Sequence, residues 1–319
     1  MSDLLYLTRA DVEGLGVTAR EMTGMLSRLL KGLRSGASVN TPKRAINRED
    51  GRLYMSMLAA SDDPPRFATK SLGLSPANAA RGLPSIGALI CLHDSATGAP
   101  IAVMDGDWIT GVRTAALSAL AAQHLARPDA QVLSLIGTGV QGSCHLQLFS
   151  ELFPLTTVRI LGRGRANIEK LAAEAHALGL ATEEPGSAQA AVEGADLVVS
   201  SVTPTPELPR FLDPAWLAEG AFVSMVELAR AWQVDRLAGR ARVFTDDREQ
   251  ERQMADPLLE FSLIEGDLAG LASGETPGRR EASETIAFAF RGLAMGDLAL
   301  AALCHEKALA AGVGTRLPR

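Results

Sequence analysis

The sequence contains little cysteine. Cys91, Cys144 and Cys304 are widely separated in 319 residues, form no CxxC pair, and have no histidine at the spacing of a zinc ligand. These spacings exclude a disulfide framework and the common zinc motifs. We therefore expect free thiols, a reducing compartment and no metal site.

Long hydrophobic runs and a basic targeting segment are also missing. No apolar stretch approaches the roughly 18 residues that a membrane span needs. The N-terminus carries acids at Asp3, Asp11 and Glu13 instead of a basic region and an apolar core. The net charge of −6 and the pI near 5.5 provide no basic field for nucleic acid or an anionic membrane surface. We expect a cytoplasmic protein that binds neither membranes nor nucleic acid.

Lysine and aromatic residues are scarce as well. Five lysines stand against 26 arginines, and aromatic residues make up 4% of the chain. A single arginine is therefore expected to be an ordinary surface residue, whereas a lysine inside a dense motif carries more information. The length and the hydrophobic content of 47% fit a globular protein of two domains.

The most informative feature present is a short apolar strand, residues 131–136, that runs into a GxGxxG motif. The motif comprises Gly137, Thr138, Gly139, Val140, Gln141 and Gly142. Such a turn brings the free N–H groups of a helix N-terminus to a pyrophosphate. Glycine-rich turns also occur as plain strand-to-helix connections, but here an apolar helical stretch follows and residues 157–161 read as a second strand. The sequence therefore predicts a dinucleotide site.

The end of this second strand predicts which dinucleotide binds. An NAD-binding unit places an acid there, about 20 residues after the glycines, to hold the ribose hydroxyls. This chain instead reads Leu-Gly-Arg-Gly-Arg over residues 161–165, and a guanidinium at Arg163 suits a 2′-phosphate. NADP(H) is favoured and NAD(H) remains possible, since Arg163 could also be an ordinary solvated arginine.

Before the glycine motif, the chain reads as α+β. Apolar positions at helical spacing predict an N-terminal helix within residues 8–34, with Thr18 as a possible N-cap. Strands are expected at 53–58, 67–72 and 88–94, separated by Pro-rich and Gly-rich turns. This pattern predicts an antiparallel sheet.

From residue 110 onward, helical and strand patterns alternate. Helices are expected at 110–126 and 166–178, and strands at 197–201, 221–226 and 242–245. This alternation predicts a doubly wound parallel sheet of the Rossmann type. Residues 282–311 read as a long alanine-rich helical region outside the alternation, interrupted at Arg291-Gly292 and at Gly296. A C-terminal helix of this kind often packs back onto the first domain.

The expected fold is therefore α/β with two domains. A Rossmann domain spans 113–299, and an α+β domain for substrate binding and dimerisation is built from both termini, 1–112 and 300–319.

The segment from Lys70 to Leu120 contains, in order along the chain, the motifs KSLG, GLPS, LHD, TGAP, MDGD and TGVRTAA. In these motifs it closely resembles the ornithine cyclodeaminase and mu-crystallin family. The resemblance continues through the glycine motif, GDLAG and GR at 266–279, and the stretch from Gly292 to Asp297. It implies a homodimer that pairs through the N-terminal domain, a Rossmann domain for NAD(P)(H), and hydride transfer on a small amino or imino acid.

The resemblance also implies which cations hold the substrate. Arg44, Lys70 and Arg113 match the family positions that bind the substrate carboxylate, a task that suits fixed cations. Lys70 lies in an otherwise apolar strand, where a lysine costs free energy unless it is paired. We expect burial beside the two arginines to lower its pKa and suit it to giving a proton to an imine nitrogen. Arg44 could instead be an ordinary surface residue.

The expected cofactor contacts are spread over several segments. The glycine motif is assigned to the pyrophosphate and Arg163 to the adenosine end. The remaining expected contacts are Ser85, Arg113, Thr114, Ser201, Thr203 and Val226. Some of these polar residues match family positions and others follow strand ends. Plain caps and turn residues are the alternative interpretation.

One departure from the family bears on function. Cyclodeaminases carry an aspartate after the strand that matches 221–226, and alignment by this strand puts Ala229 in its place. Alanine cannot accept a proton, and Glu227 would have to act from a different backbone position, several ångströms away. The family's Lys-Ser before its C-terminal glycine is also replaced, which places Arg291 beside the substrate end.

Reduction of an imino acid needs a hydride source, cations that hold the carboxylate and a proton source, and this sequence offers all three. Cyclisation needs the aspartate base, which Ala229 replaces here. The mu-crystallin branch likewise lacks that aspartate. The sequence therefore favours an NADP(H)-dependent ketimine reductase or amino-acid dehydrogenase, with Lys70 and Glu227 as catalytic residues and Arg44, Arg113 and Arg291 as further substrate ligands. The alternatives are a cyclodeaminase-type lyase with tightly bound NAD(H) and a non-catalytic protein that binds NADPH and a small ligand.

Overall fold

The computed structural model describes residues 3–203, 205 and 207–319. The chain divides into unit 1, Met1–Arg113 with Leu293–Arg319, and unit 2, Thr114–Gly292. The boundary expected at residue 300 lies inside a helix, α9 (Ala294–Ala311), so residues 293–299 are grouped with unit 1 instead of the Rossmann part.

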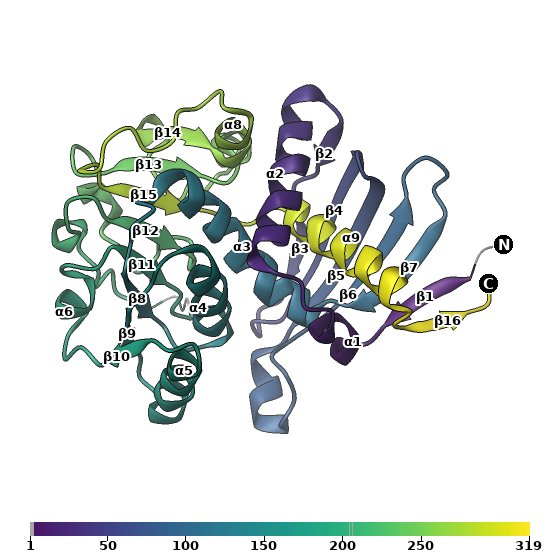
Figure 1. Cartoon of the computed structure of the whole chain (residues 1–319), viewed down its shortest axis with the longest axis horizontal. Coiled ribbons are helices and arrows are strands. Elements are labelled where there is room, and N and C mark those ends of the chain that lie inside the picture. Colours follow the sequence, from purple (N-terminus) through teal and green to yellow (C-terminus); the bar gives the residue numbers. More distant parts are fainter. Residues whose placement is uncertain (1–2, 204, 206) are drawn as a thin grey trace. The chain divides into compact units, whose positions relative to one another are not determined.

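Unit 1 is built on a mixed sheet with the strand order β16-β1-β7-β6-β5-β4-β2, in which β3 also pairs with β4 (Figure 1). The expected antiparallel sheet is correct for β4 to β7, but β1 joins β7 in parallel. The strands are β1 (Leu4–Leu7), β2 (Ser38–Asn40), β3 (Arg44–Asn47), β4 (Leu53–Asp62), β5 (Pro65–Leu74), β6 (Ile86–Asp94), β7 (Pro100–Asp105) and β16 (Thr315–Leu317).

Helices cover one face of this sheet. Helix α9 packs on β4, β5 and β6, and α2 (Ala19–Ser35) packs on α9. The expected N-terminal helix is divided into α1 (Arg9–Gly14) and α2, because Gly16 adopts φ +60° and Thr18 starts a new helix. The Thr18 side chain accepts from the Glu21 N–H as predicted for an N-cap, and Glu21 reciprocates in a capping box. A short 3₁₀ segment spans Pro76–Arg81.

Unit 2 is a parallel sheet in the order β10-β9-β8-β11-β12-β15-β13-β14. Its strands are β8 (Val132–Ile136), β9 (Thr157–Leu161), β10 (Ala181–Glu183), β11 (Leu197–Ser200), β12 (Phe222–Met225), β13 (Arg242–Thr245), β14 (Ile264–Asp267) and β15 (Ile286–Ala289). The chain reverses its direction of strand addition between β8 and β11. In open α/β sheets, ligands bind outside the carboxyl ends of the strands at this point.

The helices of unit 2 follow its strands. They are α4 (Val140–Leu152), α5 (Arg165–Ala177), α6 (Ala188–Val192), α7 (Arg248–Arg252) and α8 (Leu268–Ser273), with 3₁₀ turns at Pro214–Trp216, Val234–Arg236 and Phe261–Leu263. Helix α3 (Asp107–Leu125) crosses the boundary at Arg113. Among the described residues, no helix has both the length and the apolar character needed to cross a membrane.

The prediction of a helical region over 282–311, interrupted at Arg291-Gly292 and at Gly296, is wrong in its first part. Ile286–Ala289 forms β15, which pairs with β12 and β13 inside the sheet and is buried on both faces. Burial and strand pairing inside the sheet outweigh the helix propensity of alanine in this stretch. The second part is helical as expected, and α9 packs on the sheet of unit 1.

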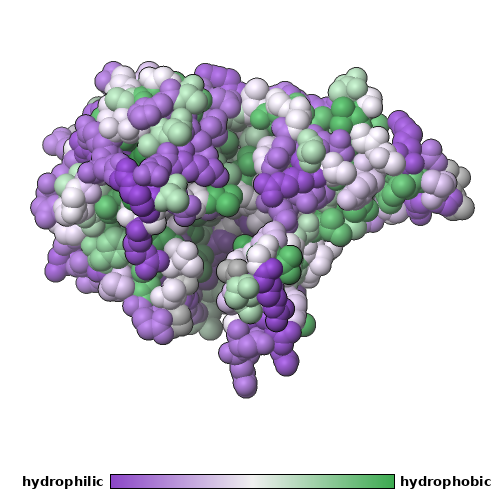
Figure 2. Space-filling model, turned by 90° about the horizontal axis from the view of Figure 1, so that it is seen from below, coloured by the Kyte–Doolittle hydropathy of each residue, from purple (hydrophilic) through white to green (hydrophobic). Residues whose placement is uncertain are grey.

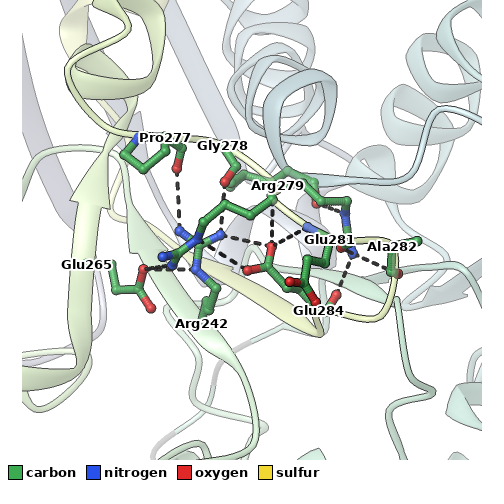
Figure 3. Close-up of polar contacts among 10 residues, drawn as sticks. Arg242, Glu265, Pro277, Gly278, Arg279, Glu281, Ala282 and Glu284 are labelled. Atoms are coloured by element: carbon green, nitrogen blue, oxygen red, sulfur yellow. Dashed lines mark hydrogen bonds and ion pairs between the residues drawn. The ribbon is translucent and has the colours of Figure 1, made fainter.

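The segment that leads into β15 is held by arginines (Figure 3). Arg242 donates to the Glu265 and Glu284 carboxylates at 2.9 and 3.1 Å and to the Gly278 carbonyl at 2.9 Å. Arg279 donates from its Nε to the Leu125 carbonyl at 2.8 Å and from its Nη1 to the carbonyls of Ala282 and Glu284. These bonds tie residues 277–285 to the sheet and to the end of α3.

Candidate active site

Each of the three motif glycines of unit 2 is required, or tolerated, for a different structural reason. Gly137 adopts φ +115°, and a Cβ there would lie 2.7 Å from the Ser201 carbonyl oxygen. A Cβ at Gly142 would lie 2.7 Å from the Gly137 oxygen, so the helix packs directly on the turn. A Cβ at Gly139 would meet nothing within 4 Å. This division into tight turn, open approach and close packing is that of a pyrophosphate-binding turn.

A cavity of about 540 Å³ opens at this edge of the sheet. Its lining includes six predicted cofactor residues: Gly137, Thr138, Gly139, Arg163, Ser201 and Thr203. An apolar wall of Val202, Leu208, Pro209 and Phe211 completes it. The sequence analysis missed this wall because it lies outside the glycine motif and has no spacing pattern of its own. The cavity has the polar floor and apolar wall that a nucleotide needs.

Two neighbouring arginines at the end of β9 differ in their partners. Arg165 pairs with Glu169 at 2.8 Å and with Glu184 at 2.6 Å. Arg163 forms no ion pair with a described residue and lines the cavity instead. Its guanidinium is therefore the one of the two available to a ligand there.

A buried polar chain lies behind the glycine turn. The His145 ring contacts the Gln141 carbonyl at 2.7 Å through Nδ1 and the Ser118 hydroxyl at 2.9 Å through Nε2. Ser118 in turn lies 2.8 Å from the Ser224 hydroxyl. Burial lowers the pKa of His145 to about 4, so the ring is neutral at neutral pH. These hydrogen-bonded side chains tie α4 to α3 and β12, and they hold the glycine turn in place.

The loop after β12 carries Glu227 on a strained turn. The next two residues, Leu228 and Ala229, adopt φ +62° and +56°, although neither is glycine. Non-glycine residues in this region cost free energy and occur where the surrounding structure enforces them, often at functional sites. The turn orients the Glu227 side chain inward, where it is 4% exposed.

Glu227 is an isolated buried carboxyl group. Neither of its oxygens has a hydrogen bond of good geometry to a described residue. Burial raises the pKa of Glu227 to about 7, and nearby backbone N–H groups and the Ser200 hydroxyl oppose this shift only in part. Ser200 accepts a hydrogen bond from the Trp232 indole at 2.8 Å. A carboxyl group in this environment exchanges its proton near neutral pH.

Unit 1 holds the predicted lysine. Lys70 stands in β5 between Met57 and Ile90 of the neighbouring strands and is 1% exposed. Its ammonium donates to Oδ1 of Asp297, in the first turn of α9, at 2.7 Å. Burial, followed by the positive charges of Arg113 and Lys43, lowers the pKa of Lys70 to about 8, although Asp297 acts in the opposite direction. The prediction that burial and Arg113 lower this pKa agrees with the structure. Arg44, the second arginine expected beside Lys70, is not among the causes.

Arg113 lies at the same place. It is 9% exposed, and its Nε is 3.5 Å from the Asp297 oxygen that Lys70 also contacts. A Cβ at Gly296 would lie 3.1 Å from the Arg113 side chain, which explains a glycine inside α9. Lys70, Arg113 and Asp297 thus form a buried cluster with two positive charges and one negative charge.

Arg44 does not join this cluster. It pairs across the sheet with Ser56, whose partner on β5 is Ser71, the residue after Lys70. Since successive side chains of a strand point to opposite faces, Arg44 lies on the face away from Lys70. It lines an open cavity of about 390 Å³ there with these two serines. The expectation that Arg44 flanks Lys70 is therefore wrong, and the flanking charge comes from Lys43.

Arg291 is held by unit 2 itself. Its Nε contacts the buried Glu251 carboxylate at 2.7 Å, and it also donates to the Asp256 carbonyl. Its side chain is 11% exposed. The guanidinium therefore holds the segment around residues 251–258, and a contact between Arg291 and the substrate stays a prediction.

The remaining predicted cofactor residues lie in different places. Ser85 is exposed in unit 1, ahead of β6. Thr114 lies in α3 of unit 2, and Val226 follows β12, where its N–H donates to the Ser200 carbonyl. Val140 and Gln141 begin α4, and neither lines the cavity of unit 2.

Asp297 is the residue that the sequence analysis missed. Although it appeared in a family motif, no chemistry was assigned to it. The available signal was an acid inside the alanine-rich apolar stretch 294–304, every residue of which is buried. A buried acid in such a stretch requires a cationic partner, and Lys70 is the buried lysine that provides it.

The fold and the cavity of unit 2 define a dinucleotide-binding α/β protein. The model of the ornithine cyclodeaminase/mu-crystallin family matches residues 3–312, so this chain belongs to that family. It is 32% identical over 256 residues to the ketimine reductase mu-crystallin of Rattus norvegicus, covering 79% of each chain.

Two solved structures extend the comparison. The Δ1-pyrroline-2-carboxylate reductase of Thermococcus litoralis, in complex with NADH and L-proline, is similar with a TM-score of 0.88 and 28% identity, covering 98% of this chain and 99% of that one. A lysine cyclodeaminase is similar with a TM-score of 0.86 and 27% identity, covering 99% and 96%. The family thus contains both the reductases and the cyclodeaminases between which the sequence analysis had to choose.

Proposed function

We propose that this chain is a nicotinamide-dependent oxidoreductase that reduces the C=N bond of a small imino acid, or oxidises the corresponding amino acid. The observation that carries the proposal is the buried Lys70, whose pKa of about 8 suits proton exchange at neutral pH. The dinucleotide cavity of unit 2 and the similarity to a ketimine reductase and a pyrroline carboxylate reductase support it.

In this proposal, each group has one task. The glycine turn of unit 2 would hold the pyrophosphate of the dinucleotide, whose nicotinamide would supply the hydride for the imine carbon. Lys70 gives a proton to the nitrogen, so that C=N becomes CH–NH, and it is then reprotonated from water. Arg113 holds the substrate carboxylate as a fixed cation. Reversal of the same two transfers oxidises an amino acid.

Cyclodeamination is the less favoured candidate. The alignment places Ala229 where cyclodeaminases carry their base, and Ala229 is buried on the strained turn. Glu227 is the acid nearest to it in sequence and has a pKa of about 7. We assign Glu227, in unit 2, a second proton-exchanging role. The similarity to a lysine cyclodeaminase keeps this candidate in the tests below.

For the cofactor, we propose a preference for NADP(H). The support is Arg163, which lines the cavity without an ion-pair partner among the described residues, at the strand end where an NAD-binding unit carries an acid. The related reductase structure holds NADH, so NAD(H) is the alternative that a direct comparison must exclude.

We also propose that the chain forms a homodimer through the open face of the unit 1 sheet. Six large apolar residues on this face are between 36% and 62% exposed: Tyr6, Val39, Ile46, Tyr54, Leu58 and Leu89. Their cross-strand partners place them on the side away from Lys70. In Figure 2, hydrophobic side chains reach the surface of unit 1 among hydrophilic ones. An apolar face of this kind marks an interaction surface.

The experiment is a set of spectrophotometric assays on the purified chain. NADPH oxidation is measured with cyclic ketimines and with pyruvate plus methylamine, and NADP⁺ reduction is measured with L-amino acids. We expect activity in at least one assay, and we expect Lys70→Met to reduce its kcat by roughly 10²-fold or more while NADPH still binds. Lys170→Met, at an exposed lysine, is the control.

Tight NADPH binding with no turnover in any assay would instead support a binding protein. Full activity of Lys70→Met would refute the role of this lysine.

A further inference from the structure

Asp297 is a buried acid whose side-chain contacts among the described residues are with cations. It is 2% exposed in the first turn of α9, and the helix residues around it are buried. Isolated ionised carboxylates are too costly to bury, so the negative charge exists there because Lys70 and Arg113 accompany it.

The geometry of the pair is asymmetric. Oδ1 of Asp297 receives Lys70 at 2.7 Å and lies 3.5 Å from Nε of Arg113, whereas Oδ2 has no hydrogen-bond partner among the described residues. A buried ion pair that serves stability satisfies its remaining lone pairs, because it must offset the desolvation of both charges. The residues beside Lys70 in the sheet, Met57 and Ile90, pack against the same helix layer without any charge.

We propose that Asp297 is the positioning residue of Lys70, holding its ammonium at a fixed point and preserving its protonated form in the interior. This inference rests on the proposed function, in which Lys70 delivers a proton. The charged groups that face Lys70 are Arg113 from α3, Lys43 ahead of β3, and Asp297 from α9. Asp297 is the single negative charge among them, so it alone favours the ammonium.

The direction in which Asp297 shifts the pKa of Lys70 follows from its charge. Asp297 raises the proton affinity of Lys70 against burial and two positive neighbours. Asp297→Asn removes that contribution and keeps the shape, so it is expected to weaken the proton affinity of Lys70 roughly tenfold or more. The alkaline decline of the reductive kcat, which reports loss of the ammonium, is expected to move to lower pH by the same amount.

The chain offers a direct readout of this effect. It contains five lysines, so NMR of protein labelled with [13Cε]lysine gives five titrations, and Lys70→Met identifies the signal of Lys70. Wild type, Asp297→Asn and the surface control Asp63→Asn are titrated, and the pH profile of kcat is recorded for each. We expect Lys70 to titrate near pH 8 in wild type and in the control, and at lower pH in Asp297→Asn.

An unchanged Lys70 titration in Asp297→Asn overturns the inference. A shifted titration without a shift in the pH profile supports the inference but refutes Lys70 as the proton donor, which separates the two proposals. If Asp297→Asn does not fold, Asp297→Glu carries the test: moving the carboxylate by one methylene is expected to lower kcat roughly tenfold with KM nearly unchanged. An unchanged kcat in that variant overturns the inference.

Discussion

At the scale of single residues, the buried Glu227 makes the stability of the fold depend on pH. Its carboxyl group has a pKa near 7 in the folded protein because burial disfavours the charge, while the ordinary value applies after unfolding. Between the two values, the folded state binds more protons than the unfolded state. The free energy of unfolding therefore falls as the pH rises through this window.

We predict that Glu227→Gln removes this decline in the free energy of unfolding with rising pH. The variant is expected to match wild type near pH 4 and to be more stable at pH 8 by about 3 kcal/mol at most. Urea unfolding at both pH values measures the difference, with the exposed Glu306→Gln as the control. Equal stabilities of wild type and Glu227→Gln at pH 8 would mean that Glu227 titrates normally.

The choice of cofactor depends on Arg163. Replacing Arg163 with Ser is expected to weaken NADPH binding roughly 10- to 100-fold, because charged hydrogen bonds to a phosphate are lost, and to leave NADH binding unchanged. Arg165→Ser removes a neighbouring arginine that is engaged with Glu169 and Glu184 and serves as the control. Fluorescence titration with both cofactors measures the effect. An equal loss for NADH and NADPH would contradict the assignment.

At the scale of elements, the segment before β15 depends on two neighbouring motif residues. A Cβ at Gly278 would lie 2.4 Å from the His124 carbonyl oxygen, and Arg279 binds the end of α3 at Leu125. The Gly-Arg motif is therefore explained by this packing at the start of β15, and no substrate contact is needed to account for it.

Arg279→Ala is expected to destabilise the fold by about 2–4 kcal/mol, because it leaves several carbonyls without donors. Arg280→Ala changes the adjacent arginine, whose side chain is 55% exposed and whose ion pairs are worth less than about 1 kcal/mol. Urea unfolding compares the two variants. Similar losses for both would show that Arg279 has no special role.

The same scale shows what the sequence predicts. The glycine turn was predictable because its requirements are local: a strand, a tight turn and a helix start. The position of Arg44 was not, because its face depends on the register in which it pairs with Ser56 on the next strand. Strand β15 was predicted as helix because of its alanines. Its burial inside the sheet, which makes it a strand, depends on tertiary packing. Asp297 and Lys70, far apart in sequence, meet only through the packing of α9 on the sheet.

At the scale of the whole molecule, the account predicts a dimer held by the open sheet face of unit 1. Leu58→Asp would place a charge among the exposed apolar residues of that face and is expected to weaken the dimer roughly 100-fold or more. Leu178→Asp changes a similarly exposed leucine in unit 2 and serves as the control. Size-exclusion chromatography with light scattering measures both. A monomeric wild type, or a Leu58→Asp dimer as stable as wild type, would contradict this interface.

The central claim is hydride transfer to a carbon that bears nitrogen beside a carboxylate, and isotope transfer tests it most directly. The enzyme is incubated with Δ1-pyrroline-2-carboxylate and NADPH deuterated on one or the other face of C4, and the product is analysed by mass spectrometry. The account predicts proline with one deuterium at Cα from one of the two labelled cofactors. Unlabelled product from both cofactors, or formation of proline from ornithine without net oxidation of NADPH, would contradict it.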